Sequence, residues 1–283
     1  MNDIINGVLK KHKITEWGTV RARIYTERLE MLSKSVPFVT ATPEERINPF
    51  KIMEKAKSVI VFLLPYKADD KKTNLSEYAK GEDYHIVAER ICDDIIDVLN
   101  NNGFKGIGFC DNGTLDDRYL AYLAGLGIYG KNGLIINDKY GTYTFIGYVV
   151  TDMECDDGVA KPGMCIGCDK CIKSCPGGAI SDDGIDYTLC ASYLTQKKGV
   201  LSELEEGIIK KSGYIWGCDI CQSVCPMNKN AEKTEIYAFL HDTIEELNDE
   251  GLTNKEFLNK YKHRAFSWRG VGIIRRNIKI SRN

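Results

Sequence analysis

The spacing of the cysteines between residues 165 and 226 constrains this chain more than any other feature. Four of its 11 cysteines follow one another at gaps of two, two and three residues, with a proline directly behind the fourth. A second set of three repeats the end of this pattern, and one isolated cysteine lies between the sets. The residues are Cys165, Cys168, Cys171, Cys175 and Pro176, then Cys190, then Cys218, Cys221, Cys225 and Pro226. Thiols this crowded indicate a metal site in a reducing compartment rather than disulfides.

The first set reads C-x2-C-x2-C-x3-C-P, the bacterial ferredoxin pattern, in which the fourth cysteine binds the other of two iron–sulfur clusters. Two [4Fe–4S] clusters need eight thiolates, and the two sets plus the isolated cysteine supply eight. Two-residue gaps turn three sulfurs toward one cube, whereas the three-residue gap and Pro176 carry Cys175 past it. We therefore predict that one cluster is bound by Cys165, Cys168, Cys171 and Cys225, and the other by Cys175, Cys190, Cys218 and Cys221.

A pair of structural zinc sites is the rival interpretation, because C-x2-C pairs also suit zinc. Zinc does not account for the third cysteine at the same gap or for the C-x3-C-P endings. Three further cysteines, Cys92, Cys110 and Cys155, lie outside the pattern. We interpret them as free thiols, which behave as small hydrophobic side chains.

The composition indicates a globular protein of one large domain or two smaller ones. The chain has 283 residues, of which 43% are hydrophobic, and its formal net charge is -2. That charge gives no overall attraction to nucleic acid or membrane. The N-terminus lacks the apolar segment of a secretory signal, and no apolar run approaches the ~18 residues of a membrane span. We expect a cytoplasmic protein with no membrane partner.

Residues 1–151 show alternating helical and strand patterns, which predict an α+β domain. Residues 1–35 favour helices, with one apolar stripe near Ile4 and another near Leu29, and residues 36–48 look like a loop. The run from Ser58 to Leu64 is short, apolar and β-branched, so it predicts a buried strand. We then expect a helix over 83–100, a strand over 105–110, a turn over 111–114, a helix over 115–126, and strands over 134–136 and 142–151 joined by a hairpin loop over 137–141.

The last segment, 231–283, has helical patterns near 236–247 and 254–261 and is strongly basic from residue 255 onward. Its basic residues are Lys255, Lys260, Lys262, Arg264, Arg269, Arg275, Arg276, Lys279 and Arg282, against only Glu256. Two interpretations stay open: a solvated helical face, or a patch that contacts the phosphates of RNA or of a cofactor. We expect three domains: 1–151 for catalysis, 152–230 for the clusters, and the helical basic segment 231–283.

Several blocks resemble the epoxyqueuosine reductase family. Residues 77–85, EYAKGEDYH, resemble its RYAxGxDYH motif, and residues 111–118 with 124–132 resemble its "VD…P..ER…AGLGWIGKN" block. Phe145-Ile-Gly-Tyr148 resembles its F-[IL]-G-E segment. Residues 190–195, CASYLT, resemble C-I-S-Y-L-T, and residues 214–222, YIWGCDICQ, resemble I-[YF]-G-C-D-x-C-Q. Because these blocks occur in the family's order from about residue 55 to the end, the resemblance is specific.

The resemblance implies a cobalamin-dependent reductase that converts epoxyqueuosine in tRNA to queuosine, using base-off cobalamin and two [4Fe–4S] clusters. It implies a nitroreductase-like cobalamin-binding domain, shared with reductive dehalogenases, before a bacterial-ferredoxin-like domain. It also implies tRNA as a partner and an external low-potential electron donor such as flavodoxin or ferredoxin, and we expect a monomer. The cofactor-binding residues that we carry over are Tyr84, His85, Asp111, Lys131, Asn132, Ile135, Ile146, Ser192 and Tyr193.

The resemblance places the catalytic proton donor at Asp111. Converting an epoxide to an alkene consumes two electrons and two protons, and its leaving oxygen needs a proton from a positioned acid. Clusters pass single electrons, whereas low-valent cobalt in a corrin can deliver two. A free aspartate is ionised at neutral pH, so the donor needs burial or a neighbouring negative charge. Without the family block, an aspartate before Asn-Gly at a strand end is more simply a turn cap.

Several positions depart from the family pattern, and three of them bear on the site. Glu77 stands where the motif has arginine, Tyr148 where it has glutamate, and Ile128 where it has an aromatic residue. The sequence also stops at Asn283, where a helical-repeat domain would follow in full-length relatives, so we expect a short member. Two alternatives stay open: a related cobalamin-dependent reductase with another substrate, and a two-cluster electron-transfer protein. A reductive dehalogenase is disfavoured, since no twin-arginine leader is visible.

Overall fold

The computed structural model describes residues 2–32 and 38–282, which divide into two compact units. The first, here the sheet unit, comprises Met1–Pro65, His85–Gly130 and Leu134–Cys165. The second, the cysteine unit, comprises Tyr66–Tyr84, Lys131–Gly133 and Ile166–Asn283. This division groups the basic tail and residues 66–84 with every predicted cluster cysteine except Cys165, which ends the last segment of the sheet unit. The functional division expected at residues 151 and 230 stays a prediction.

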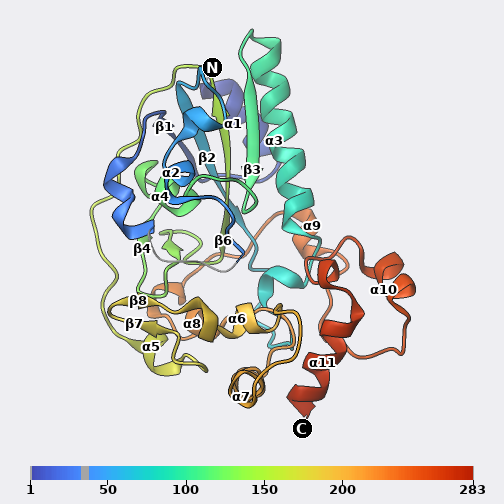
Figure 1. Cartoon of the computed structure of the whole chain (residues 1–283). Helices are drawn as coiled ribbons and strands as arrows, with labels where there is room; N and C mark the ends of the chain where they lie inside the picture. The colour runs from blue at the N-terminus through green and yellow to red at the C-terminus, as the bar shows by residue number, and fades with distance from the viewer. Residues whose placement is uncertain (1, 33–37, 283) are drawn as a thin grey trace. The chain divides into compact units, whose positions relative to one another are not determined.

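An antiparallel sheet of four strands forms the centre of the sheet unit (Figure 1). Its order is β1 (Trp17–Arg21), β2 (Ser58–Pro65), β6 (Thr144–Thr151) and β3 (Gly106–Cys110). Every residue of β2 is buried, which explains its continuous apolar run in place of alternation. The register pairs Ser58 with Thr151 and Pro65 with Thr144. The strand predicted over 58–64 is therefore confirmed, and β3 and β6 lie where strands were expected.

Strand β1 corrects the prediction that residues 1–35 are helical, of which residue 1 and residues 33–35 lie outside the described part of the chain. Helix α1 (Asn2–Lys11) is present, but Trp17–Arg21 pairs with β2 along its whole length. The buried side chains of Thr19 and Val20 fit a pleated surface. Five residues are too few to show a strand period next to a helical stripe, so the pairing with β2 decides the conformation.

Helices pack on this sheet through close approaches at small residues. Helix α3 (Tyr84–Asn101) begins with the last two residues of the RYAxGxDYH-like segment and lies against β3 (Figure 1). A Cβ atom at Gly108 would lie 2.5 Å from the Cβ of Cys92, so only glycine lets the helix approach so closely. Cys92 is buried there, which agrees with its interpretation as a packed thiol. The remaining helices of this unit are α2 (Pro43–Arg46) and α4 (Asp117–Leu123).

Two short strands correct the predicted hairpin between residues 134 and 151. Strand β5 (Ile135–Ile136) pairs with β4 (Ile128–Tyr129), not with β6. The loop that follows closes on itself through an antiparallel bridge between Asn137 and Gly141, and Gly141 has a φ of +58°. The turn was therefore correctly located, but the strands that it joins belong to different sheets.

The cysteine unit is built mostly of short helices. They are α5 (Lys170–Ser174), α6 (Ala191–Leu194), α7 (Glu203–Ser212), α8 (Ile220–Ser223), α9 (Tyr237–Leu240), α10 (Asn254–Tyr261) and α11 (Val271–Arg282), with one hairpin of β7 (Ile180–Ser181) and β8 (Gly184–Ile185). Seven 3-10 turns complete the description of both units: Thr26–Arg28, Glu30–Leu32, Pro49–Lys51, Glu77–Ala79, Tyr187–Leu189, Pro226–Asn228 and Ser267–Arg269. None of the helices described has both the length and the apolar character that crossing a membrane requires.

The C-terminal tail forms an apolar core with residues that precede the second cysteine set. Phe266 and Ile274 of the tail belong to one buried cluster with Trp216 and Leu75. Helix α10 agrees with the helix predicted over 254–261, and a capping box of Thr253 and Glu256 begins it. The helix predicted over 236–247 is wrong beyond residue 240, where the chain leaves helical geometry.

Candidate functional site

The two cysteine sets end in the same local geometry. Cys175 and Cys225 each follow a short helix in extended backbone, with φ and ψ of -64° and 121° and of -75° and 120°. A proline follows each of these cysteines, and helical geometry is disfavoured for the residue before a proline. Cys190, with 122° for ψ, likewise stands in extended backbone at the start of α6. The C-x3-C-P endings therefore turn the last cysteine of each set away from its own helix.

Four of the thiols lie near one another in the cysteine unit. The pKa of Cys218 is raised to about 12, chiefly by burial, and the charges of Cys190 and Cys175 are among the smaller causes. Burial likewise raises the pKa of Cys221 well above its ordinary value, with Cys218, Cys190 and Cys175 as further causes. These are the four cysteines predicted to share one cluster. Thiolates so buried need the positive charge of a metal.

Among the described residues, no three His, Cys, Asp or Glu side chains are arranged to hold a single metal ion. A [4Fe–4S] cube, by contrast, binds four separate cysteine thiolates. The donor set is of the kind that such a cube takes.

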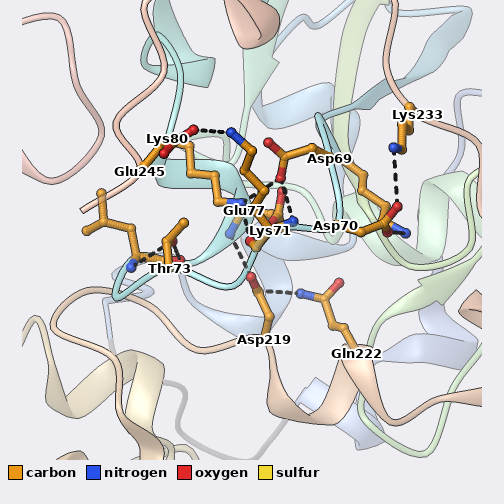
Figure 2. A network of polar contacts seen from close by, with 12 residues as sticks. Asp69, Asp70, Lys71, Thr73, Glu77, Lys80, Asp219, Gln222, Lys233 and Glu245 are labelled. Atoms are coloured by element: carbon orange, nitrogen blue, oxygen red, sulfur yellow. Dashed lines mark hydrogen bonds and ion pairs between the residues drawn. The ribbon is translucent and has the colours of Figure 1, made fainter. Parts of the chain in front are cut away.

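A buried polar network joins the second cysteine set to residues 66–84 (Figure 2). Asp219, next to Cys218, accepts 2.6 Å and 2.9 Å hydrogen bonds from the Glu77 backbone N–H and the Gln222 side-chain amide. The Tyr66 hydroxyl donates to the other end of the Gln222 side chain at 3.1 Å. Burial raises the pKa of Asp219 to about 7. The network therefore holds Glu77, the first residue of the RYAxGxDYH-like motif, against the segment that carries the second cysteine set.

Glu77, where the family pattern has arginine, points into this network (Figure 2). Its carboxylate pairs with the ammonium group of Lys80, whose side chain is 3% exposed. Lys80 also contacts a carboxylate oxygen of Asp69 at 3.2 Å and donates to the backbone carbonyl of Lys71 at 2.9 Å. Burial, opposed by Lys80, raises the pKa of Glu77. The charge reversal at this position is thus compensated internally.

In the sheet unit, the structure brings together two residues predicted for the site, Asp111 and His85. Asp111 follows the last residue of β3 in left-handed backbone, with a φ of +61°. Its carboxylate oxygen Oδ2 lies 4.0 Å from Nε2 of His85, the second residue of α3. Both side chains are exposed. The side chain of Asp111 is therefore available to a ligand and has an imidazole within electrostatic reach.

Asp117 is a candidate that the sequence analysis missed. It is the first residue of α4, and burial raises its pKa to about 7, with the charges of Asp111 and Asp116 as further causes. Its neighbour Asp116 instead pairs with Arg28 at 2.6 Å. The paired aspartates within the family-like block were a possible signal. Only the fold shows that Asp116 has a cationic partner whereas the pKa of Asp117 is raised by burial.

The other predicted cofactor contacts lie in varied surroundings. Lys131 pairs with carboxylates of Asp169 and Asp182 at 2.7 Å and 2.6 Å, so its ammonium group faces the first cysteine set. Tyr84 is buried, with its ring centroid 6.0 Å from that of Tyr78 in an edge-to-face arrangement, and Asn132 is also buried. Ile135 and Ile146 belong to the apolar core of the sheet unit, and Ser192 and Tyr193 lie on α6. Their contacts with a cofactor stay predictions.

Three basic residues of the tail serve the fold. The buried Arg264 donates to the backbone carbonyl of Lys80 at 3.0 Å and pairs with Asp242 at 2.6 Å. Arg275 pairs with Asp249 at 2.9 Å, and Arg276 donates to backbone carbonyls near residue 197. These guanidinium groups stabilise the cysteine unit instead of forming a solvated face. Lys255, Lys262 and Lys279 are exposed.

Comparison with known proteins identifies relatives of both halves of the chain. The family model described as "Epoxyqueuosine reductase QueG, DUF1730" matches residues 46–112, and a 4Fe-4S double cluster binding domain matches residues 164–228. The epoxyqueuosine reductase of Lactococcus garvieae is 35% identical over 256 residues, covering 83% of this chain and 71% of the relative. That of Bacillus subtilis is 32% identical over 256 residues, covering 83% and 64%.

Solved structures extend the likeness to almost the whole chain. An epoxyqueuosine reductase solved with an epoxyqueuosine-modified tRNA-Tyr stem loop has a TM-score of 0.88 at 27% identity, covering 99% of this chain and 80% of its own. A Bacillus subtilis epoxyqueuosine reductase, solved with its catalytic aspartate loop swung out of the active site, has a TM-score of 0.85 at 27% identity, with the same coverage. A reductive dehalogenase, with a TM-score of 0.51 at 16% identity over 82% of this chain and 32% of its own, shares the fold alone.

Proposed function

The chain belongs to the epoxyqueuosine reductase family, and we propose that it reduces epoxyqueuosine in tRNA to queuosine, with two [4Fe–4S] clusters and cobalamin as cofactors. The observation that carries the proposal is the agreement, over 99% of the chain, with a family member solved with its modified tRNA stem loop. A two-cluster electron carrier would need no second unit with an Asp111 loop. The two-unit architecture therefore favours the enzyme.

The eight cysteines of the two sets and Cys190 would hold the clusters. The electrostatic proximity of Cys175, Cys190, Cys218 and Cys221 supports their assignment to one cluster. The remaining four, Cys165, Cys168, Cys171 and Cys225, would hold the other. When bound, the clusters supply electrons one at a time and cobalamin delivers two to carbon, which the side chains of this chain cannot do.

Two buried polar atoms support a cofactor that brings amide groups to the second cysteine set. The indole Nε1 of Trp216 and the hydroxyl Oγ of Ser76 are buried and have no hydrogen-bond partner among the described residues. Ser76 lies against Gly217, where a Cβ atom would be 2.0 Å from its hydroxyl oxygen. A buried donor without a partner costs about 1–3 kcal/mol. The amide side chains of a corrin would supply the missing acceptors.

We propose Asp111 as the proton donor to the leaving oxygen, with Asp117 as its neighbouring acid. Asp111 lies at the end of β3 beside His85, in the block that resembles the family's catalytic loop. Asp117 holds a proton near neutral pH, because its pKa is about 7. General acid catalysis needs a proton available at the working pH, and the carboxyl group of Asp117 meets that condition.

The finer parts of the proposal follow from the resemblance. They are a nitroreductase-like cobalamin-binding domain, base-off cobalamin, contacts to the corrin by Tyr84, His85, Lys131, Asn132, Ile135, Ile146, Ser192 and Tyr193, a low-potential donor such as flavodoxin or ferredoxin, and a monomer acting in the cytoplasm. Neither Glu77 nor Tyr148 argues for another substrate, because both are accommodated within the fold.

The test is an anaerobic assay of reconstituted protein with epoxyqueuosine-containing tRNA, with queuosine measured by mass spectrometry of nucleosides. We expect conversion that requires both cobalamin and a low-potential reductant. Omission of cobalamin is the matched control, since the clusters then remain. If the protein retained cobalamin and both clusters but formed no queuosine, the proposal that epoxyqueuosine in tRNA is its substrate would be refuted. Failure to retain cobalamin would instead favour the electron carrier.

A further inference from the structure

A buried asparagine in the last helix links two segments that carry cysteines. Asn277 lies in α11 with no exposed surface, among the apolar side chains of that helix. Its amide nitrogen donates to the backbone carbonyls of Thr195, at 2.7 Å, and of Ile215, at 2.8 Å. A buried amide is tolerated only when it is hydrogen-bonded. Asn277 therefore fixes the end of α6 against the chain that leads into Cys218.

The neighbouring Arg276 reinforces the same contact. Its guanidinium donates to the backbone carbonyls of Lys197 at 2.7 Å, of Gly199 at 3.2 Å and of Leu194 at 3.3 Å. The last carbonyls of a helix lack partners within it, and Arg276 supplies a donor for one at the end of α6. It also donates to the side-chain oxygen of Asn277 at 3.0 Å, which orients the amide.

Thr195 completes a direct link between the two segments. Its hydroxyl oxygen accepts a hydrogen bond of 3.0 Å from the backbone N–H of Gly217, the residue before Cys218. The same hydroxyl donates to the backbone carbonyl of Ser192 at 3.0 Å. On the other side, the backbone N–H of Leu194 donates to the carbonyl of Cys190 at 2.9 Å, so Thr195 is held to Cys190 through one helical turn.

Cys190 is the cysteine that most needs such support. The other seven stand in sets whose short gaps place their sulfurs, whereas Cys190 has no cysteine within ten residues on either side. Its position relative to Cys218 and Cys221 therefore depends on tertiary contacts. Resting on the proposed assignment of these cysteines to one cluster, we propose that Asn277, together with Thr195, is a positioning residue that holds Cys190 in place for that cluster.

The first test counts clusters and not turnover. Asn277→Leu removes the amide at similar size, and Arg275→Gln is the matched control, because Arg275 lies on the same helix but contacts Asp249 and Leu252. After anaerobic reconstitution, we expect iron and sulfide in Asn277→Leu to fall to about half, as in Cys190→Ala, and to stay unchanged in the control. Adding Cys190→Ala to Asn277→Leu should cost no further cluster.

A milder pair of variants keeps the test informative if Asn277→Leu folds poorly. Thr195→Val removes the hydroxyl that meets Gly217, and Thr195→Ser restores it. We expect Thr195→Val to alter the EPR spectrum or the occupancy of one reduced cluster, and Thr195→Ser to match the wild type. Wild-type clusters in both Asn277→Leu and Thr195→Val would overturn the proposal. So would loss of both clusters in Asn277→Leu with wild-type spectra in Thr195→Val. Because no substrate is used, these outcomes are independent of the proposed reaction.

Discussion

The hydroxyl group of Tyr148 accepts a hydrogen bond of 3.2 Å from the backbone N–H of Leu115, four residues beyond the proposed proton donor. Tyr148 is buried on β6, so its oxygen reaches the Asp111 loop from the central sheet. A Cβ atom at Gly113 would lie 1.9 Å from that oxygen, so any larger residue at position 113 would clash with the hydroxyl group. The tyrosine that replaces the family's glutamate thus supports the loop that carries Asp111.

Replacing Tyr148 by phenylalanine should slow turnover without removing a cofactor. The change deletes one hydrogen bond to the loop, which is worth about 0.5–1.5 kcal/mol, and we expect a rate about 2- to 10-fold lower. Single-turnover queuosine formation at equal cobalamin and cluster content measures it. Tyr140→Phe is the matched control, because it removes the hydroxyl of a buried tyrosine that contacts Thr15. Equal rates in the two variants would mean that Tyr148 does not support the loop.

Replacing Lys80 by methionine should destabilise the chain strongly. It leaves the carboxylate of Glu77 buried without its partner, which typically costs about 3–5 kcal/mol. We expect a lower midpoint of thermal unfolding, largely restored by adding Glu77→Gln. Lys71→Met, which breaks the exposed pair with Glu245, should change the midpoint little. A Lys80→Met protein as stable as Lys71→Met would show that Glu77 needs no compensating charge.

Asp117 should make stability fall as the pH rises through neutrality. Its pKa in the fold is about 7, against about 3.9 for an unfolded aspartate, so the folded chain binds this proton more tightly. That stabilisation is complete below about pH 3.9 and is lost as the pH rises through 7. Relative to wild type, Asp117→Asn should therefore gain in unfolding midpoint between about pH 5.5 and pH 8.

The control for this pH effect is an exposed aspartate in the same unit. Asp138, which pairs with Lys161 at 2.7 Å and is 84% exposed, offers it as Asp138→Asn. We expect the difference between this variant and wild type to stay constant over the same pH range. A constant difference for Asp117→Asn as well would contradict the buried environment inferred for that carboxyl group.

The parts of the fold that were predicted correctly are those with strong local patterns. The continuous apolar run of β2 and the helical spacing of α3 leave few other structures open. Strand β1 was missed because five residues carry little periodicity, and its conformation depends on pairing with a strand about 40 residues away. The partner of β5 was missed for the same reason, since strand pairing is set by tertiary contacts.

The candidate site shows the same division between local and non-local information. Cysteine spacing is local, so the cluster ligands could be proposed from sequence, whereas the support of Cys190 by Asn277 depends on residues about 80 positions apart. The interpretation of the basic tail as a solvated face is wrong for Arg264. The sequence shows the charge of this side chain, but not that its guanidinium group donates to a buried backbone carbonyl. Asp117 was overlooked because its partly buried surroundings are a property of the fold.

The most direct test of the account compares wild type with Asp111→Asn in a single-turnover assay on epoxyqueuosine-containing tRNA. Both proteins are first matched for cobalamin, iron and sulfide, so that only the carboxyl group differs. The account predicts unchanged cofactor content and queuosine formation slower by about 100-fold or more, the usual contribution of a general acid. Queuosine formation at the wild-type rate in Asp111→Asn would contradict it.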